Sequence, residues 1–266
     1  MRFTSLSSGS EGNALVVEST SGRHGDPTRL LVDCGLALKE VTARLAQRGL
    51  AISDIDAIFV THEHNDHVGG VARLARAGGL PVLCTHGTRA ACPDEFWSGV
   101  QVSEVDSHAD IELCDFQLRC FPVPHDAREP VQLVIEEIHL GATGHRLGVL
   151  TDVGKSTPFI EEALSGCDGL FLEANHDEAL LAASDYPPSL KQRIGGPFGH
   201  LSNTQSAGVL AAVDQSRLQT VVAAHLSRHN NRPELAHDAL RPVLRTQSQL
   251  HIASQANGLD WLALAR

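Results

Sequence analysis

Features of a membrane-bound or secreted protein are missing from this 266-residue sequence. No apolar stretch approaches the ~20 residues that a helix needs to cross a bilayer. The first residues, from Met1 onward, lack the apolar core of a signal peptide and run directly into a strand-like pattern. We therefore expect a cytoplasmic protein without a membrane partner.

The six cysteines form no C-x-x-C pair, and several of them lie within apolar runs. In a chain without a secretion signal, such cysteines are expected to be reduced and buried. The sequence thus predicts neither disulfides nor a cysteine-ligated structural zinc site. Aromatic residues are also scarce, at 4%, so the core must consist mainly of aliphatic side chains.

An excess of positive charge is also absent, because the formal net charge is −11. Such a balance opposes non-specific binding of nucleic acid, which normally depends on a broad basic surface. It leaves room for a local basic groove, and bound divalent cations would cancel part of the charge. Histidine, in contrast, is abundant, and its 15 residues carry most of the functional information.

The order of the predicted elements favours one α/β domain over residues 1–266. Uninterrupted apolar runs indicate buried strands at residues 55–60, 80–84, 147–150, 169–172 and 220–224. Apolar periodicity or a start signal predicts helices at residues 38–50, 68–77, 158–164, 204–213 and 233–244. Residues 101–150 are expected to form mostly short strands. Histidines and acids recur where strands end, which is the edge where α/β proteins place their active sites.

The decisive pattern is H-x-H-x-D-H, formed by His62, His64, Asp66 and His67 directly after a predicted buried strand. His62 and His64 can chelate one ion, while Asp66 and His67 turn towards a second. Imidazole with carboxylate suits Zn²⁺, Fe²⁺ or Mn²⁺ rather than Ca²⁺. Two ions ~3.5–4 Å apart can share a water whose pKa falls towards neutrality, which makes it a nucleophile. Histidines gathered by chance are the alternative, and four metal-competent residues in six positions argue against it.

The segment 61–70, with the sequence THEHNDHVGG, resembles the signature of the metallo-β-lactamase superfamily. The resemblance implies an αββα sandwich, in which two mixed sheets pack together with helices on the outer faces. It also implies two divalent metal ions, Zn²⁺ or Mn²⁺, and a structural acid at Asp33. The implied ligands are His62, His64 and His125 for the first ion, Asp66, His67 and His225 for the second, and Asp152 as the bridge. Taken alone, His125 also fits a surface histidine and Asp152 a turn or helix cap.

Motifs in the last third of the chain resemble the nuclease branch of that superfamily, to which the RNase Z-type enzymes belong. These motifs are EANHD at 173–177, GHLSN at 199–203 and HLSRHNN at 225–231. Together with SSGSEGNA at 7–14, they are similar to the YycJ/WalJ-like hydrolases, a subgroup regarded as DNA exonucleases. The resemblance therefore implies a phosphodiester hydrolase with DNA as its substrate.

A phosphodiester hydrolase must also protonate or stabilise the departing alkoxide. By the resemblance, His200 is the candidate acid and Glu173 orients it; Asp66 is the third candidate catalytic residue. A helix cap or a support for a metal ligand is an equal interpretation of His200. Candidate substrate contacts are Ser10, Asn13, His176 and Arg228. Alternatively, Ser10 and Asn13 only shape a tight turn, His176 is a structural histidine, and Arg228 is a lone surface charge.

Two interpretations of the substrate stay open at this point. The motifs favour a DNA exonuclease, whereas the acidic composition suits a small-molecule phosphodiesterase or another ester hydrolase on the same metal site. A groove lined with basic side chains would favour the polymer, and a closed pocket would favour the small ester. The candidates for such a lining are Arg128, Lys155, Lys191, Arg193 and Arg228. A non-catalytic protein of this fold would lack a ligand, and all seven ligand positions are filled.

Overall fold

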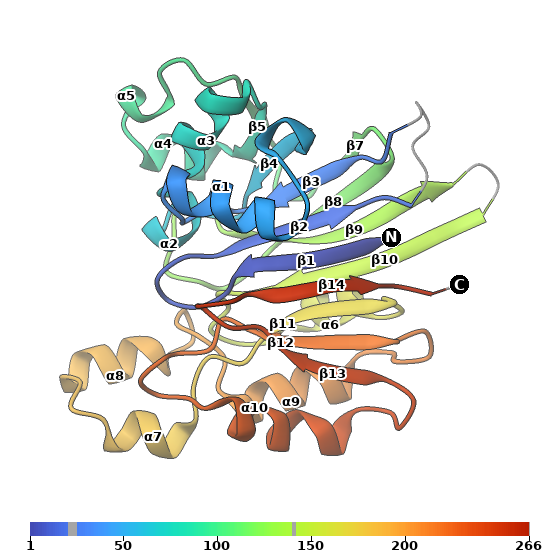
Figure 1. The fold of residues 1–266 in the computed structure, drawn as a ribbon. Helices are drawn as coiled ribbons and strands as arrows, with labels where there is room; N and C mark the ends of the chain where they lie inside the picture. The colour runs from blue at the N-terminus through green and yellow to red at the C-terminus, as the bar shows by residue number, and fades with distance from the viewer. Residues whose placement is uncertain (21–25, 140–141, 266) are drawn as a thin grey trace.

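The computed structural model describes residues 1–20, 26–139 and 142–265. In these residues two mixed, seven-stranded sheets lie face to face (Figure 1). The first sheet consists, in chain order, of β1 (Arg2–Ser7), β2 (Ala14–Glu18), β3 (Arg29–Val32), β4 (Ala57–Val60), β5 (Val82–Thr85), β6 (Val102–Val105) and β14 (Leu259–Ala263). Its spatial order is β14-β1-β2-β3-β4-β5-β6.

The second sheet has the spatial order β13-β12-β11-β10-β9-β8-β7. Its strands are β7 (Asp110–Leu113), β8 (Phe116–Pro122), β9 (Val131–His139), β10 (Ala142–Leu150), β11 (Gly169–Glu173), β12 (Thr220–Ala224) and β13 (Gln249–Ile252). β10, β11, β12 and β13 run parallel, as do β3, β4, β5 and β6 in the first sheet. The carboxyl ends of each parallel group therefore lie at one edge of its sheet.

Helices cover the outer face of each sheet, which confirms the predicted αββα sandwich (Figure 1). Those of the first half are α1 (Leu38–Gln47), α2 (Asn65–Val68), α3 (Val71–Gly78), α4 (His86–Ala91) and α5 (Asp94–Trp97). Those of the second half are α6 (Pro158–Leu164), α7 (Glu178–Ala183), α8 (Pro188–Ile194), α9 (Asn203–Ala212) and α10 (Pro233–Leu240). Short 3-10 turns occupy Ile52–Asp54 and Arg241–Val243. Within the described residues, no helix has the length and apolar content that a membrane crossing requires.

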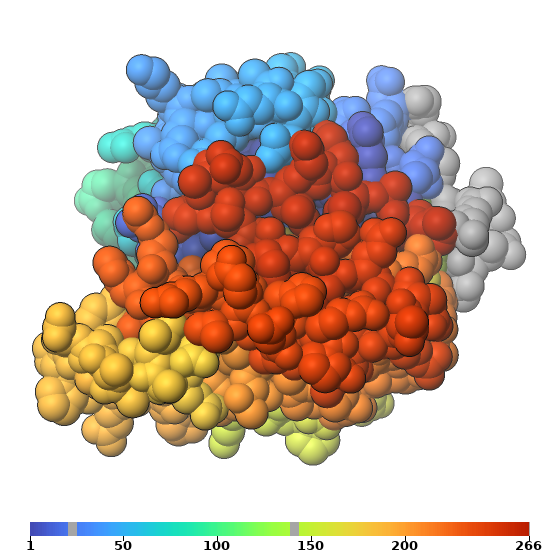
Figure 2. Space-filling view, turned by 60° about the horizontal axis from the view of Figure 1, so that its bottom comes forward, coloured from blue at the N-terminus to red at the C-terminus, as the bar shows by residue number. Residues whose placement is uncertain are grey.

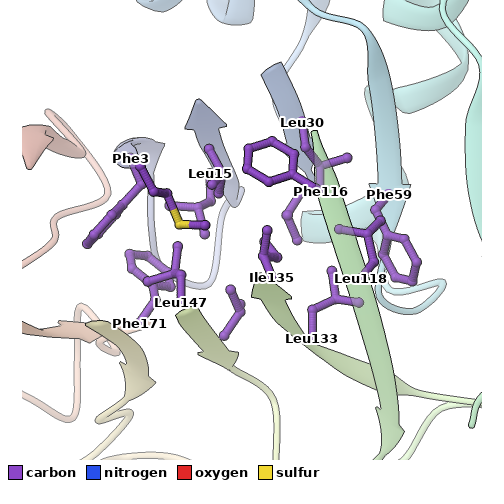
Figure 3. Close-up of a cluster of buried hydrophobic side chains, with 14 of the residues drawn as sticks. Phe3, Leu15, Leu30, Phe59, Phe116, Leu118, Leu133, Ile135, Leu147 and Phe171 are labelled. Atoms are coloured by element: carbon purple, nitrogen blue, oxygen red, sulfur yellow. The ribbon is translucent and has the colours of Figure 1, made fainter. Parts of the chain in front are cut away.

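The two sheets share one apolar core (Figure 3). Phe3, Leu15 and Phe59 project into it from the first sheet and meet Phe116 and Leu133 of the second. Two further buried clusters lie between the sheets and their helices. The expectation of uninterrupted burial in the central strands is confirmed, since all residues of β4 and β12 are buried.

Three parts of the element prediction were wrong. Residues 68–77 are not one helix, because the N–H of Gly70 donates to Cys34 O (2.8 Å) and separates α2 from α3. The strands β9 and β10 have nine residues each, longer than the short strands expected there. The helices α4, α5, α7 and α8 were not predicted. α8 buries none of its residues, so it has no buried apolar stripe to reveal it; Figure 2 shows α7 and α8, in yellow, protruding at the edge of the molecule.

Candidate metal centre

The candidate site lies where five parallel strands end. His62 follows β4, Glu173 is the last residue of β11, and His225 directly follows β12. Asp33 follows β3, and Asp152 comes two residues after β10. Because β3 pairs with β4, and β11 pairs with β10 and β12, these positions are neighbours at the edges of the two facing sheets.

Three of these strand-end residues have left-handed backbone conformations. The φ angles are 60° at Asp33, 54° at Asp152 and 56° at His225. Such a conformation costs a non-glycine residue about 1–3 kcal/mol and persists where its surroundings fix it. Here the fixing contacts are hydrogen bonds: the N–H of His225 donates to Ser8 Oγ (2.7 Å), and the N–H of Asp33 donates to Phe59 O (2.8 Å). The strain is concentrated at the residues that carry the site.

The first group of candidate ligands consists of His62, His64 and His125, whose ligand atoms lie within 4.8 Å of one another. The Nδ1 of His125 donates to Gly199 O (3.0 Å), so its Nε2 carries a lone pair. That Nε2 lies 3.2 Å from Nδ1 of His64. With the hydrogen of neutral His64 on Nε2, the lone pairs of both facing nitrogens are directed at a common point where a cation fits.

His62 completes this group from a fully buried position. The hydroxyl of Thr61 donates to Asp33 Oδ2 (2.8 Å) and therefore accepts from Nδ1 of His62 (3.0 Å). The remaining Nε2 of His62 is buried and has no hydrogen-bond partner among the described residues. A buried, unpartnered ring nitrogen is costly unless a metal ion uses it.

The second group consists of Asp66, His67 and His225, again with ligand atoms within 4.8 Å. Nδ1 of His67 donates to Asp33 Oδ2 (2.8 Å), which directs Nε2 into the site. Nε2 of His67 and Nε2 of His225 each lie 3.4 Å from Asp66 Oδ2. Asp33 is thus a support for the ligand His67, as expected for a structural acid beside the site.

Asp152 lies between the two groups. Its Oδ2 is 3.0 Å from Nε2 of His67, and its Oδ1 is 3.9 Å from Nε2 of His125 and 3.6 Å from Nε2 of His225. The Oδ2 atom is buried and makes no well-formed hydrogen bond within the described residues. A carboxylate in this position reaches both groups, so the residues present fit a pair of divalent cations.

Glu173 organises the site from a completely buried position. Its Oε1 lies 2.9 Å from Nδ1 of His200 and 3.1 Å from Nδ1 of His225, and it accepts from the N–H of Asp152 (3.2 Å). Its Oε2 accepts from the N–H groups of Val153 (3.2 Å) and Leu201 (3.0 Å). Burial raises the pKa of this carboxyl, but attraction to His200 and the hydrogen bonds with His200 and His225 outweigh it and lower the pKa to about 2. With both oxygens engaged, Glu173 supports its neighbours rather than acting as a ligand.

His200 lies next to the metal groups, with Nδ1 3.5 Å from Asp152 Oδ1. Because Nδ1 donates to Glu173, Nε2 is the atom available to a substrate, and 22% of the side chain is exposed. Burial lowers the pKa of His200, but attraction to the Glu173 carboxylate outweighs it, so the pKa is raised. The arrangement matches the predicted pairing of His200 with Glu173 in geometry.

The field in the site is strongly negative. Burial lowers the pKa of His225, yet the surrounding carboxylates raise it on balance to about 10. The same carboxylates, with Asp152 the strongest, overcome burial at His67 and raise its pKa well above the ordinary value. A cluster that stabilises positive charge on two buried imidazoles will also stabilise divalent cations.

The four predicted substrate contacts lie in different surroundings. Asn13 is buried, accepts from the N–H of Gly9 (2.9 Å), and lies with Nδ2 3.2 Å from Asp66 Oδ2. Ser10 is exposed in the turn before it. His176 is buried, and its Nδ1 has no hydrogen-bond partner within the described residues. Arg228 is exposed and forms an ion pair with Glu11. Of the four, Asn13 is the one in contact with candidate ligands.

Most of the basic residues expected to line a groove form ion pairs with carboxylates or donate hydrogen bonds to backbone carbonyls. Arg193 forms an ion pair with Asp126, and Nζ of Lys191 donates to Ala182 O (2.6 Å). Arg128 donates from its guanidinium to Ala90 O (3.3 Å), and Lys155 is exposed. Of the five, Arg193 and Arg228 are paired with carboxylates, so these side chains do not separate the polymer from the small ester.

Sequence reasoning gave no role to several residues that support the site. Nδ2 of Asn175 donates to the carbonyl of His225 (3.0 Å), and Ser8 accepts from its N–H. Oδ1 of Asp126 lies 3.5 Å from Nε2 of His125. Asn175 and Ser8 lie within the motifs at 173–177 and 7–14, which was a usable signal. The contact itself was not predictable, because Ser8 is 217 positions from its partner.

Comparisons with known proteins agree with this geometry. Residues 28–226, a segment that spans every predicted ligand, match the family described as the Beta-lactamase superfamily domain. The chain is 34% identical over 251 residues to exodeoxyribonuclease YycJ of Bacillus anthracis, covering 92% of this chain and 89% of that protein. It is 33% identical over 241 residues to exodeoxyribonuclease WalJ of Streptococcus pneumoniae, covering 89% and 85%. Among solved structures, the metallo-β-lactamase fold protein YhfI of Bacillus subtilis has a TM-score of 0.70 at 15% identity and covers 98% of each chain.

Proposed function

The chain belongs to the beta-lactamase superfamily of metal-dependent hydrolases, and from this premise we propose that it is a DNA exonuclease that uses two divalent metal ions. The observation that carries the proposal is the meeting of seven ligand-type side chains with the His200–Glu173 pair at the adjoining edges of the two sheets. The similarity to YycJ and WalJ over most of the chain supports DNA as the substrate.

In this proposal His62, His64 and His125 would hold one ion, Asp66, His67 and His225 would hold the other, and Asp152 would be a ligand to both. When bound, the ions supply charge neutralisation at the phosphate and activation of the attacking water. The protein fixes the ring orientations beforehand, since Asp33, Thr61 and Gly199 each hold the Nδ1 side of a ligand histidine. This support lowers the cost of ordering the ligands when the ions bind.

His200 supplies the proton that the chemistry needs at the leaving side. Glu173 holds Nδ1 of His200 (2.9 Å), so the proton to be transferred is carried on Nε2, which faces the open side of the site. The raised pKa favours the protonated form of His200, which is the form that a general acid requires. Transfer of that proton to the departing oxygen avoids the release of a free alkoxide.

The test is hydrolysis of end-labelled linear duplex DNA with Mn²⁺ or Zn²⁺, with an Asp66→Ala variant in parallel. We expect progressive shortening from one end that disappears in the variant and after chelation of the metal. A small chromogenic phosphodiester serves as the second substrate. Turnover of the small ester without any cleavage of DNA would refute the exonuclease and favour a small-molecule phosphodiesterase on the same site.

A further inference from the structure

A large aromatic side chain lies exposed beside the candidate site. Phe198 is 56% exposed, and it stands two residues before His200. Single exposed apolar residues are ordinary on protein surfaces, so exposure alone carries no function. Among the described residues, Phe159 is a second exposed phenylalanine, at 49%, on α6 and away from the site residues. It provides an internal comparison for Phe198.

The backbone of Phe198 is held rigidly on both sides. Its carbonyl accepts from the N–H of Asp126 (2.9 Å), the residue after His125. A Cβ on the following Gly199 would lie only 2.1 Å from Arg193 O, so the chain there packs directly against the end of α8. A Cβ on Gly154 would lie 2.4 Å from the nitrogen of Phe198 itself. The ring is therefore exposed on a fixed support and not on a loose loop.

The ring borders a hollow that is continuous with the site loops. The hollow has a volume of about 360 Å³ and is lined by Phe198, Pro197, Asp126 and residues of α8, including Gln192 and Arg193. This volume falls in the ~300–1,000 Å³ range of small-ligand sites. One wall is Asp126, whose Oδ1 lies 3.5 Å from Nε2 of the candidate ligand His125, so the hollow adjoins the candidate metal centre.

We propose that Phe198 is a stacking platform for a nucleobase of the DNA strand, held in the hollow between the ring and α8. This inference rests on the proposed function and specifies how that site positions its substrate. An exonuclease must accept every base in turn, and every base offers a π-face to an aromatic ring. Stacking also needs no basic surface, which suits a chain whose formal net charge is −11 and whose Arg193 is paired with Asp126.

The experiment compares the metal-loaded wild type with Phe198→Ala, Phe198→Trp and Phe159→Ala on end-labelled DNA. Stacking contributes ~1–3 kcal/mol per base, so Phe198→Ala should lower kcat/KM roughly 5- to 150-fold. Phe198→Trp should retain most of the activity, and Phe159→Ala should remain within about twofold of the wild type. Equal metal contents and melting temperatures would show that the variants are folded.

An abasic substrate tests whether the lost contact is with a base. The abasic residue is placed in turn at each of the first positions from the attacked end. At one position the wild type should lose as much kcat/KM as Phe198→Ala loses on normal DNA, and the variant should lose nothing more. Fully additive losses, or equal behaviour of Phe198→Ala and Phe159→Ala, would overturn the proposal.

A binding readout separates this inference from the proposed function. DNA carrying 2-aminopurine near its end, with phosphorothioate linkages that slow hydrolysis, is titrated with metal-loaded protein. Stacking on the ring of Phe198 should quench the fluorescence in the wild type and not in Phe198→Ala. If the wild type cleaves no DNA, the exonuclease fails while this quenching still decides the stacking; equal or absent quenching in both proteins refutes the platform.

Discussion

Replacement of Glu173 by glutamine tests how the site is held together before any metal binds. The carboxylate accepts from N–H groups on both oxygens: those of Asp152, His200 and His225 meet Oε1, and those of Val153 and Leu201 meet Oε2. Glutamine presents one oxygen and one NH₂ group. Whichever way its amide is turned, at least two buried donors lose their acceptor.

The expected loss of stability follows from the number of donors that lose their acceptor. A buried donor without a partner costs ~1–3 kcal/mol, so Glu173→Gln should lower the free energy of unfolding by roughly 2–6 kcal/mol. Urea denaturation of the metal-free protein, followed by circular dichroism, measures this difference without a contribution from bound ions. Glu234→Gln is the matched control, because Glu234 is exposed on α10 and should change stability by less than ~0.5 kcal/mol.

The same variant should also bind metal more weakly, because Nδ1 of His225 loses its carboxylate partner. Supports of this kind contribute about 10- to 100-fold in metal affinity. Metal titration at fixed pH measures that change. A Glu173→Gln protein that unfolds within 1 kcal/mol of the wild type and binds metal equally would refute the view that this carboxylate organises the site.

Three further predictions address single contacts. Asp33→Asn, which keeps a side chain tolerated at positive φ, should weaken metal binding about 10- to 100-fold, because Nδ1 of His67 loses its charged partner; unchanged titration curves would contradict this. His200→Gln should retain both ions and lower kcat about 10²- to 10⁴-fold, as metal analysis and DNA hydrolysis can check; loss of metal would instead make His200 a ligand or its support. Burial raises the pKa of Glu137, but hydrogen bonds from Thr20 outweigh it and lower the pKa from 4.5 to about 2. The depressed pKa stabilises the fold above pH 4.5, and this stabilisation is lost as the pH falls through about 2, so thermal melts of Glu137→Gln and wild type should differ at pH 6 and converge only below pH 2.

The sequence was most informative where the functional residues are close together in the chain. His62, His64, Asp66 and His67 occupy six consecutive positions in a loop and the short helix α2 after a buried strand, so their proximity follows from local geometry alone. Asp152 is different, because its place between the two groups depends on the pairing of β10 with β11, which brings it next to Glu173. Only the resemblance to a known family allowed that residue to be named before the structure.

Other features could not be predicted because they depend on contacts between distant segments. The N–H of His225 donates to Ser8, and although Ser8 lies within the motif at 7–14, nothing in that motif indicates a partner 217 positions away. Phe198 is similar, since its exposure follows from how the chain packs between Gly199 and Gly154. Helix α8 escaped prediction because none of its residues is buried, which leaves no apolar periodicity. Local sequence patterns identify the candidate ligands, whereas the residues that support them and the side chains that are exposed depend on the tertiary fold.

Backbone strain at the strand ends connects the local sequence patterns with the tertiary fold. Asp33, Asp152 and His225 all adopt positive φ immediately beyond buried strands, and aspartate accepts this conformation more readily than most residues. At Asp152 the turn lets two successive N–H groups converge on Glu173, which forms a small anion-binding nest from backbone alone. The Glu173 carboxylate thus fixes the strained turn, the orientation of His200 and that of His225 at once. A site that needs rigid ligands obtains them here from one buried charge, and this is why the loss of that charge should affect stability, metal affinity and turnover together.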